Sequence, residues 1–188
     1  MKITFIRHSK VDYRWQKSYT AESFNLACQH YDSSSVNSNE KLEYHEQRVY
    51  ISNLSRTRDT VKLVLSGERE IIQTALLNEV PMVSFTRIRF PLPTIVWMIA
   101  GRLQWYFNSS RQTESRKQSI ERINKFLDLL QEESKDCIIV GHGFYFAQLV
   151  NEMKKRGITG DMRKKLKNDE ARVLHLPDQI VVSTTPLN

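Results

Sequence analysis

Short apolar runs, separated by longer stretches of mixed polarity, recur along the chain. The runs at 2–7, 49–51 and 137–140 are rich in β-branched and aromatic side chains, a pattern typical of buried strands. Residues 137–140 carry no charged or hydroxyl side chain on either face, as expected inside a parallel sheet. Two weaker runs predict further strands at 71–77 and 172–176.

Apolar residues at helical spacing predict helices at 19–31, 55–67, 116–133 and 144–155. The clearest stripe belongs to 116–133 and consists of Ile120, Ile123, Phe126, Leu127 and Leu130. In the segment 55–67, we expect Ser55 to be the N-cap and Gly67 to stand at the C-terminal cap. The serine- and asparagine-rich run 33–43 is predicted to be a loop.

Strands that alternate with helices favour an α/β fold with a mostly parallel central sheet flanked by helices. A chain of 188 residues is long enough for one well-buried core and short for two full domains. We therefore expect a single domain over 1–188, with a small helical insertion at about 82–115.

The insertion contains an aromatic-rich segment at 91–108 that is predicted to be helical. Trp97 and Trp105 either pack this helix over the sheet or cap a substrate pocket, and packing with a partial capping role is favoured. In the capping interpretation, one of three arginines in or beside the segment contacts the substrate: Arg87, Arg89 or Arg102.

The formal net charge is +7, and the isoelectric point is about 9.5, which suits an anionic partner. Cys28 and Cys137 lack metal-ligand or CxxC spacing, so we expect two idle thiols, with neither a disulfide framework nor a metal site. Proline, glycine, arginine and glutamine interrupt the apolar stretch 90–107, so no membrane span is expected. The apolar run at the N-terminus is too short for a signal peptide, and a cytoplasmic monomer or homodimer is the expectation.

Two histidines stand directly after predicted strands: His8 follows 2–7 and His142 follows 137–140. Ligands of open α/β sheets bind beyond the carboxyl ends of the strands, so these two side chains are predicted to face one pocket. Arg7 at the end of its strand suggests a phosphate, whose oxygens match a guanidinium fork. The other histidines, His30, His45 and His175, are interpreted as surface or structural residues.

These residues together resemble the histidine phosphatases and phosphoglycerate mutases. Arg7-His8-Ser9 is similar to the RHG motif, and 52–60 (SNLSRTRDT) resembles the second segment of that family, with Arg56 rather than Arg58 on its arginine. Leu77-Asn78-Glu79 resembles the segment with the family's acid, and Gly141-His142-Gly143 its second histidine site. Glu114-Ser115 matches a frequent Glu-Ser pair. The pieces occur in family order, and the main departure is Ser9 in place of glycine.

The resemblance implies a phosphoglycerate mutase-like fold and a role for each matching residue. His8 is the expected nucleophile, Glu79 the proton donor, and His142 a catalytic and phosphate-binding residue. Arg7, Arg56 and Ser9 are expected to bind phosphate without a cofactor or metal. Three neighbours of the motifs are candidates both for substrate contact and for solvent-exposed or packing roles: Lys10, Arg14 and Tyr145.

The leading hypothesis is a phosphatase that hydrolyses a phosphomonoester, either a small metabolite or a phosphoprotein, through a phosphohistidine intermediate. A phosphoglycerate mutase-type phosphotransferase is the first alternative. The second is a non-catalytic module that binds phosphate or nucleic acid through the basic residues at 154–156 and 163–167. Nucleic acid is not expected as a partner, because such charge runs are usually solvated surfaces.

Overall fold

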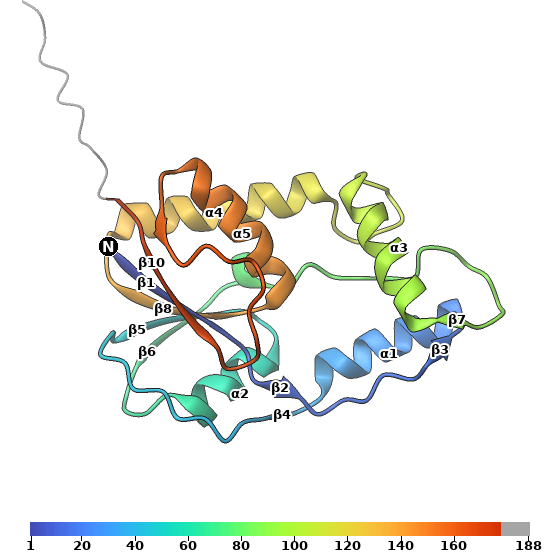
Figure 1. Ribbon diagram of the computed structural model, residues 1–188, viewed down its shortest axis with the longest axis horizontal. Coiled ribbons are helices and arrows are strands. Elements are labelled where there is room, and N and C mark those ends of the chain that lie inside the picture. Colours follow the sequence, from blue (N-terminus) through green and yellow to red (C-terminus); the bar gives the residue numbers. More distant parts are fainter. Residues whose placement is uncertain (178–188) are drawn as a thin grey trace, which may run out of the picture.

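A six-stranded sheet forms the centre of the computed structural model, which describes residues 1–177 (Figure 1). Its strand order is β6-β5-β8-β1-β10-β9. The first four run parallel, and they are β6 (Glu70–Gln73), β5 (Arg48–Ile51), β8 (Cys137–Gly141) and β1 (Lys2–Arg7). At the other edge, β10 (Ala171–His175) pairs antiparallel with β1, and β9 (Thr159–Gly160) pairs antiparallel with β10. The prediction of a mostly parallel sheet is confirmed.

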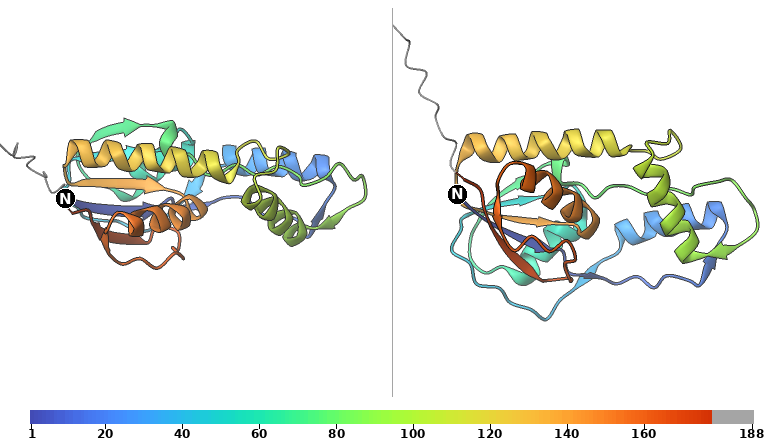
Figure 2. Two further views of the ribbon diagram at one scale, coloured as in Figure 1. Left: turned by 90° about the horizontal axis from the view of Figure 1, so that it is seen from above. Right: turned by 45° about the horizontal axis from the view of Figure 1, so that its top comes forward.

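Helices cover both faces of this sheet (Figure 2). On one face, Phe5 and Ile139 pack against α4 (Arg116–Glu133) and α5 (Gly143–Lys155). Their sequence neighbours point to the other face, where Ile6 and Ile138 pack against α2 (Ser55–Val64). Alternate side chains of one strand thus serve two cores, which explains why residues 137–140 are apolar throughout.

A second lobe projects beyond the carboxyl ends of the parallel strands (Figures 1 and 2). It contains α1 (Ala21–Ser33), α3 (Thr94–Tyr106) and the short pair β3 (Ser18–Tyr19) and β7 (Leu92–Pro93). Trp97 is fully buried there, stacked on Phe24 at a centroid distance of 5.5 Å, and its indole Nε1 donates to the carbonyl of Tyr19. Helix α3 therefore packs on α1, and the expectation that it covers the sheet is wrong.

Several predicted boundaries also change. The N-cap of α2 is Leu54, and Ser55 is its first helical residue, because the carbonyl of Leu54 already accepts a hydrogen bond from the Thr57 amide in the first turn. Helix α2 ends at Val64, so Gly67 lies outside its cap.

The strand predicted at 71–77 splits into β6 and a short 3-10 helix, η1 (Ala75–Leu77). The hydroxyl of Thr74 caps η1 by accepting from the amide of Leu76. The loop 33–43 includes β4 (Val36–Asn37), which pairs with β2 (Lys10–Val11). None of the helices in residues 1–177 combines the length and apolar character that crossing a membrane requires.

Candidate active site

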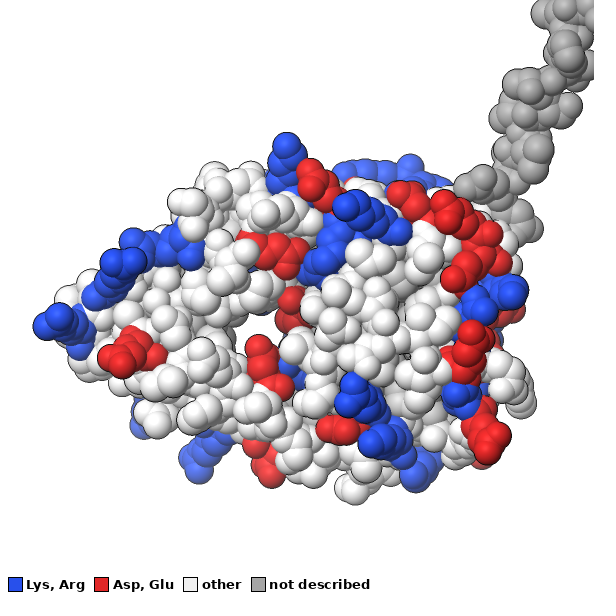
Figure 3. All heavy atoms as spheres, turned by 180° about the vertical axis from the view of Figure 1, so that it is seen from behind, with Lys and Arg blue, Asp and Glu red and all other residues white. Residues whose placement is uncertain are grey.

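A cavity of about 860 Å³ lies between the sheet and the second lobe. Figure 3 shows the surface hollowed between the two parts, with acidic side chains at the margin. Its wall combines the end of β1, α1, the start of α2, residues 78–83, α3 and the start of α5. Parallel strands bring their carboxyl ends to this edge, so the predicted location of the pocket is confirmed.

His8 lies at the floor of this cavity, one residue beyond β1. Its Nδ1 is 2.7 Å from the carbonyl oxygen of Ser9. A carbonyl can only accept, so Nδ1 carries the ring proton and Nε2 of the neutral ring keeps its lone pair. The Ser9 carbonyl therefore selects the tautomer in which Nε2, and not Nδ1, can act as a nucleophile.

The same surroundings disfavour the imidazolium form of His8. The side chain is only 2% exposed, and this burial, followed by the charge of Arg56, lowers its pKa to about 3. Arg7 acts in the same direction, whereas the hydrogen bond to the Ser9 carbonyl acts against them. His8 is consequently neutral at pH 7, as nucleophilic attack requires.

Arg7 lines the cavity beside His8. Its Nη1 donates to the carbonyl of Leu166 at 2.6 Å, while its buried Nε has no hydrogen-bond partner within residues 1–177. Gly143 provides the space for this side chain, because a Cβ at that position would lie 3.1 Å from the Cζ and Nε atoms of Arg7. An oxyanion in the cavity would satisfy the remaining guanidinium donors.

Arg56, the second residue of α2, also lines the cavity. Its side chain is 2% exposed, and its Nη1 donates to Oδ1 of Asp32 at 2.6 Å. The guanidinium also lies over the ring of Tyr31, 5.3 Å from the centroid. Arg58 points away and bonds to Gln73 near the surface, so the choice of Arg56 as the pocket arginine agrees with the structure.

His142 lies next to His8, with ring centroids 5.2 Å apart, as predicted. Its Nδ1 accepts from Nε of Arg56 at 3.1 Å, and its Nε2 is 2.8 Å from Oγ of Ser52. The ring is fully buried and is absent from the cavity wall, and that burial holds its pKa well below the usual range. Both ring nitrogens are engaged within the protein, so His142 meets the cavity through Arg56, and its expected contact with phosphate stays a prediction.

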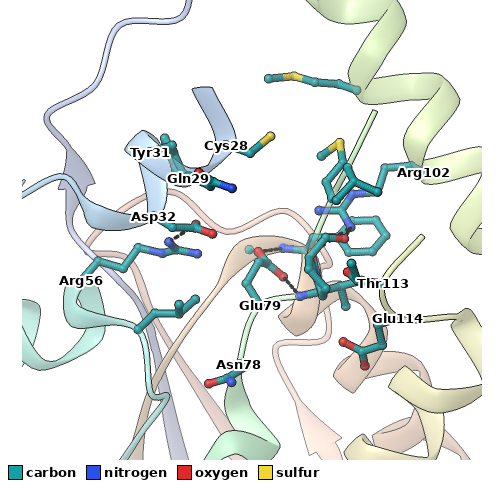
Figure 4. Close-up of a pocket in the computed structure, with 18 of the residues that line it drawn as sticks. Cys28, Gln29, Tyr31, Asp32, Arg56, Asn78, Glu79, Arg102, Thr113 and Glu114 are labelled. Atoms are coloured by element: carbon teal, nitrogen blue, oxygen red, sulfur yellow. Dashed lines mark hydrogen bonds and ion pairs between the residues drawn. The ribbon is translucent and has the colours of Figure 1, made fainter. Parts of the chain in front are cut away.

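Glu79 projects into the cavity from the loop after η1 (Figure 4). Its Oε1 accepts from the backbone amide of Tyr145 at 2.8 Å, and its Oε2 from that of Phe144 at 3.2 Å. The first turn of α5 has unpaired amides of this kind, and they hold the carboxylate in one orientation. Glu79 therefore presents a fixed carboxylate in the same cavity as His8.

Four other predicted contact residues do not line the cavity. The hydroxyl of Ser9 donates to the carboxylate of Asp169 and does not face the cavity. Tyr145 is fully buried in the core under α5, with the guanidinium of Arg122 over its ring. Lys10 and Arg14 are exposed and lie outside the cavity wall. Each of these four side chains instead packs in the core, faces solvent or bonds to another residue.

Sequence reasoning missed the face of α1 that forms one wall, comprising Cys28, Gln29, Tyr31 and Asp32. Burial raises the pKa of the Cys28 thiol to about 12, so it is a neutral part of this wall. Of the three arginines considered for capping, only Arg102 lines the cavity, while Arg87 and Arg89 are exposed. The apolar spacing at 19–31 predicted the helix. Nothing in the sequence indicated that one face of this helix lines the cavity.

The tryptophans of the insertion pack within the protein. Trp105 is buried, and its indole Nε1 donates to the hydroxyl of Ser119 on α4 at 2.9 Å. Met98 and Arg102 on the same helix line the cavity, so α3 contributes to the cap through these side chains and not through its tryptophans. Among residues 1–177, no three histidine, cysteine or acidic side chains gather where they could hold a metal ion.

The chain is similar to known proteins in sequence and in fold. The sequence model of the histidine phosphatase superfamily (branch 1) matches residues 3–179. None of the curated proteins compared with the chain matches it. Among solved structures, the α-ribazole phosphatase of Shigella flexneri has a TM-score of 0.58 at 17% identity, with 95% of each chain covered.

Two further structures are similar. A phosphoglycerate mutase from Bacillus anthracis has a TM-score of 0.57 at 15% identity, covering 94% of this chain and 91% of its own. A mycobacterial glucosyl-3-phosphoglycerate phosphatase has a TM-score of 0.54 at 16% identity, covering 93% of this chain and 89% of its own. At these identities, the likeness concerns the fold.

Proposed function

The chain belongs to the histidine phosphatase superfamily, and from that premise we propose that it hydrolyses phosphomonoesters through a phosphohistidine formed on His8. The observation that carries the proposal is the Nε2 lone pair of His8, which the Ser9 carbonyl leaves available in a cavity lined by Arg7 and Arg56. A neutral nucleophile beside two guanidinium groups is the combination that phosphoryl transfer needs.

In the first step, Nε2 of His8 attacks phosphorus while the bond from phosphorus to the ester oxygen breaks. Arg7 and Arg56 stabilise the negative charge on the remaining phosphoryl oxygens. His142 supports this step through the hydrogen bond that its Nδ1 accepts from Nε of Arg56, while Nη1 contacts Asp32 and Nη2 faces the phosphate in this proposal.

Glu79 is the proposed donor of the proton to the departing oxygen. Its carboxyl group lines the same cavity as His8 and is anchored by the first turn of α5. In the second step, Glu79 takes a proton from water, the water oxygen attacks phosphorus, and the bond between phosphorus and Nε2 breaks. Inorganic phosphate then leaves, and both residues return to their initial state.

Phosphate release from a generic aryl phosphate, with the wild type beside His8→Ala, tests the proposal. We expect the wild type to release phosphate and form an acid-labile, alkali-stable phosphoenzyme, and His8→Ala to lose both. Equal rates in the two proteins would refute His8 as the nucleophile. The exposed His30 provides a matched control, since His30→Ala should hydrolyse the ester as the wild type does.

A phosphate-labelled ester that has a second hydroxyl group, such as a phosphoglycerate, separates the alternative functions. A mutase would retain the phosphoryl group in an isomeric ester, so labelled phosphate would stay organic instead of appearing in solution. A binding module would hold the ester unchanged. The basic residues at 154–156 and 163–167 give little support to the latter, because Lys155, Arg156 and Arg163 pair with carboxylates of the protein surface.

A further inference from the structure

Four arginines line the cavity, and two of them already have a carboxylate partner. Arg56 pairs with Asp32 at 2.6 Å, and Arg122 pairs with Glu114 at 3.0 Å. Arg7 and Arg102 form no ion pair with any carboxylate of residues 1–177. The cavity therefore presents two uncompensated cations, one beside His8 and one on the wall formed by α3.

Arg102 is held in place on two sides. Its guanidinium lies over the ring of Phe144, 3.7 Å from the centroid, and its Nη1 donates to the carbonyl of Val80 at 3.0 Å. Its Nε and Nη2 have no hydrogen-bond partner in the described part of the chain, and the side chain lines the cavity. A fixed guanidinium with free donors is a preorganised site for an oxyanion.

The position of Arg102 separates it from the phosphate site. Figure 4 shows Arg102 entering the cavity from α3, across from Arg56 and with Glu79 between them. Apolar side chains also line the cavity, among them Trp15, Met82, Val83 and Met98. A cavity of about 860 Å³ is of the size that holds a whole small-molecule ligand, well beyond a phosphate group.

Burial of Arg102 beside Phe144 is unfavourable for its charge, and desolvation lowers its pKa. The carbonyl of Val80 compensates only one of its donors. Glu79 and Glu114 attract the cation from a distance without pairing with it. A ligand oxyanion would supply the missing partner.

We propose that the substrate is a small phosphomonoester whose leaving group carries a second oxyanion, a carboxylate or a phosphate, bound by Arg102. An apolar portion joins the two groups and contacts Met82 and Met98. This inference rests on the proposed function for the placement of the first phosphate at His8.

Steady-state kinetics on ω-carboxyalkyl phosphates of increasing chain length tests this subsite, with the ω-carboxamides as neutral partners and α,ω-bisphosphates as the second source of an oxyanion. The wild type should prefer at least one acid over its amide in kcat/KM. Arg102→Gln should lower kcat/KM for that acid by about ten- to a hundredfold, the loss expected for charge-assisted hydrogen bonds, and lower it far less for the amide, whose oxygen accepts without a charge. The ratio within each pair cancels differences in intrinsic reactivity.

Two further variants control for folding and charge. Arg102→Lys keeps the charge without the planar fork, and it should retain part of the preference. Arg111→Gln removes an exposed arginine outside the cavity and should change neither rate. If the wild type hydrolyses acids and amides equally at every chain length, or if Arg102→Gln slows both alike, Arg102 only ties α3 to Val80 and the proposal is overturned.

Equilibrium binding of the corresponding phosphonates, which cannot be hydrolysed, separates this proposal from the proposed function. Tighter binding of acid than of amide by the wild type, lost in Arg102→Gln, supports the subsite even where no ester is hydrolysed. In that outcome the hydrolase assignment fails and the two-anion site stands. If an active wild type binds acid and amide equally, the Arg102 subsite is refuted and the hydrolase proposal stands.

Discussion

The hydroxyl of Ser9 donates a hydrogen bond to the carboxylate of Asp169, 160 residues further along the chain. Ser9 occupies the position where the family motif that this chain resembles has glycine. The partner lies in a loop that also holds the motif backbone, since the Asp169 amide donates to the carbonyl of Arg7 and the amide side chain of Asn168 donates to that of His8. The serine is thus accommodated because its buried hydroxyl has a dedicated acceptor.

Asp169→Ala is expected to lower the free energy of unfolding by about 1–3 kcal/mol, because it leaves the fully buried Ser9 hydroxyl without an acceptor. The double variant Ser9→Gly, Asp169→Ala should lose less than the sum of the two single variants. Urea unfolding of the four proteins measures this coupling. The positive φ of 61° at residue 169 strains alanine equally in both backgrounds and cancels from the cycle.

Asp169→Asn is the matched control, since an amide oxygen still accepts and asparagine tolerates a left-handed backbone. We expect it to cost clearly less than Asp169→Ala. Strict additivity in the cycle would mean that Ser9 and Asp169 do not depend on each other.

Two pairs of residues show which contacts the sequence can predict and which it cannot. The pairing of His8 with His142 follows from local information, because each residue stands directly after an apolar strand and parallel strands bring their carboxyl ends together. The contact between Ser9 and Asp169 has no periodicity or motif behind it. It depends on how the loop before β10 returns to the end of β1.

The second lobe illustrates the same limit. A helix within 91–108 was readable from apolar spacing, and its start follows from Pro91 and Pro93, which suit an extended segment rather than a helix interior. The face of α3 that meets α1 depends on the two-residue pairing of β3 with β7, which is too short to leave a pattern. The cavity wall formed by α1 was therefore beyond prediction.

Gly143→Ala is predicted to reduce activity without reducing stability. A methyl group there would approach the Arg7 guanidinium to 3.1 Å and displace it from the phosphate site. The guanidinium must then move by a few tenths of an ångström or more. Misplacement of a group that contacts the substrate reduces kcat/KM by about ten- to a hundredfold. Alanine in α5 favours the helix by up to about 1 kcal/mol, so the free energy of unfolding should stay level or rise.

Gly141→Ala is the contrasting variant on the other side of His142. Its Cβ would lie 2.7 Å from Cζ of Phe5 inside the core, so it should destabilise the fold by about 1–3 kcal/mol. Aryl phosphate kinetics and urea unfolding of both variants give the comparison. A Gly143→Ala protein with wild-type kcat/KM would show that Arg7 does not need its present position.

Asp32→Asn is expected to strengthen the binding of inorganic phosphate. The Asp32 carboxylate contacts Nη1 of Arg56 at 2.6 Å, so it competes with a bound phosphate for that donor and repels its charge. Asp32 is 49% exposed, which screens the effect, and we expect the inhibition constant of phosphate to fall by about two- to fivefold. Glu22→Gln, on the exposed first turn of the same helix, removes one negative charge outside the cavity and serves as the control. An inhibition constant that rises in Asp32→Asn would instead indicate that Asp32 orients Arg56 for phosphate.

The buried imidazole of His8 should make stability depend on pH. Its pKa is about 3 in the folded protein and about 6.5 in an unfolded chain, so the unfolded state binds more protons between these values. The stability contributed by neutral His8 is complete above about pH 6.5 and is lost as the pH falls toward 3. The expected slope is about 1.4 kcal/mol per pH unit for this one group.

Urea unfolding of the wild type and His8→Asn between pH 7 and pH 4 isolates that slope, because asparagine does not titrate and every other group, including His142, is common to both proteins. As the pH falls, the free energy of unfolding should decrease less steeply in His8→Asn than in the wild type. The difference in slope should correspond to about one bound proton. His30→Asn removes an exposed imidazole from α1 and serves as the comparison for the loss of any histidine. Parallel pH profiles for the wild type and His8→Asn would mean that His8 is protonated as readily in the folded protein as in the unfolded chain. Its ring would then carry a positive charge in mild acid, and Nε2 would lose the lone pair that attack on phosphorus requires.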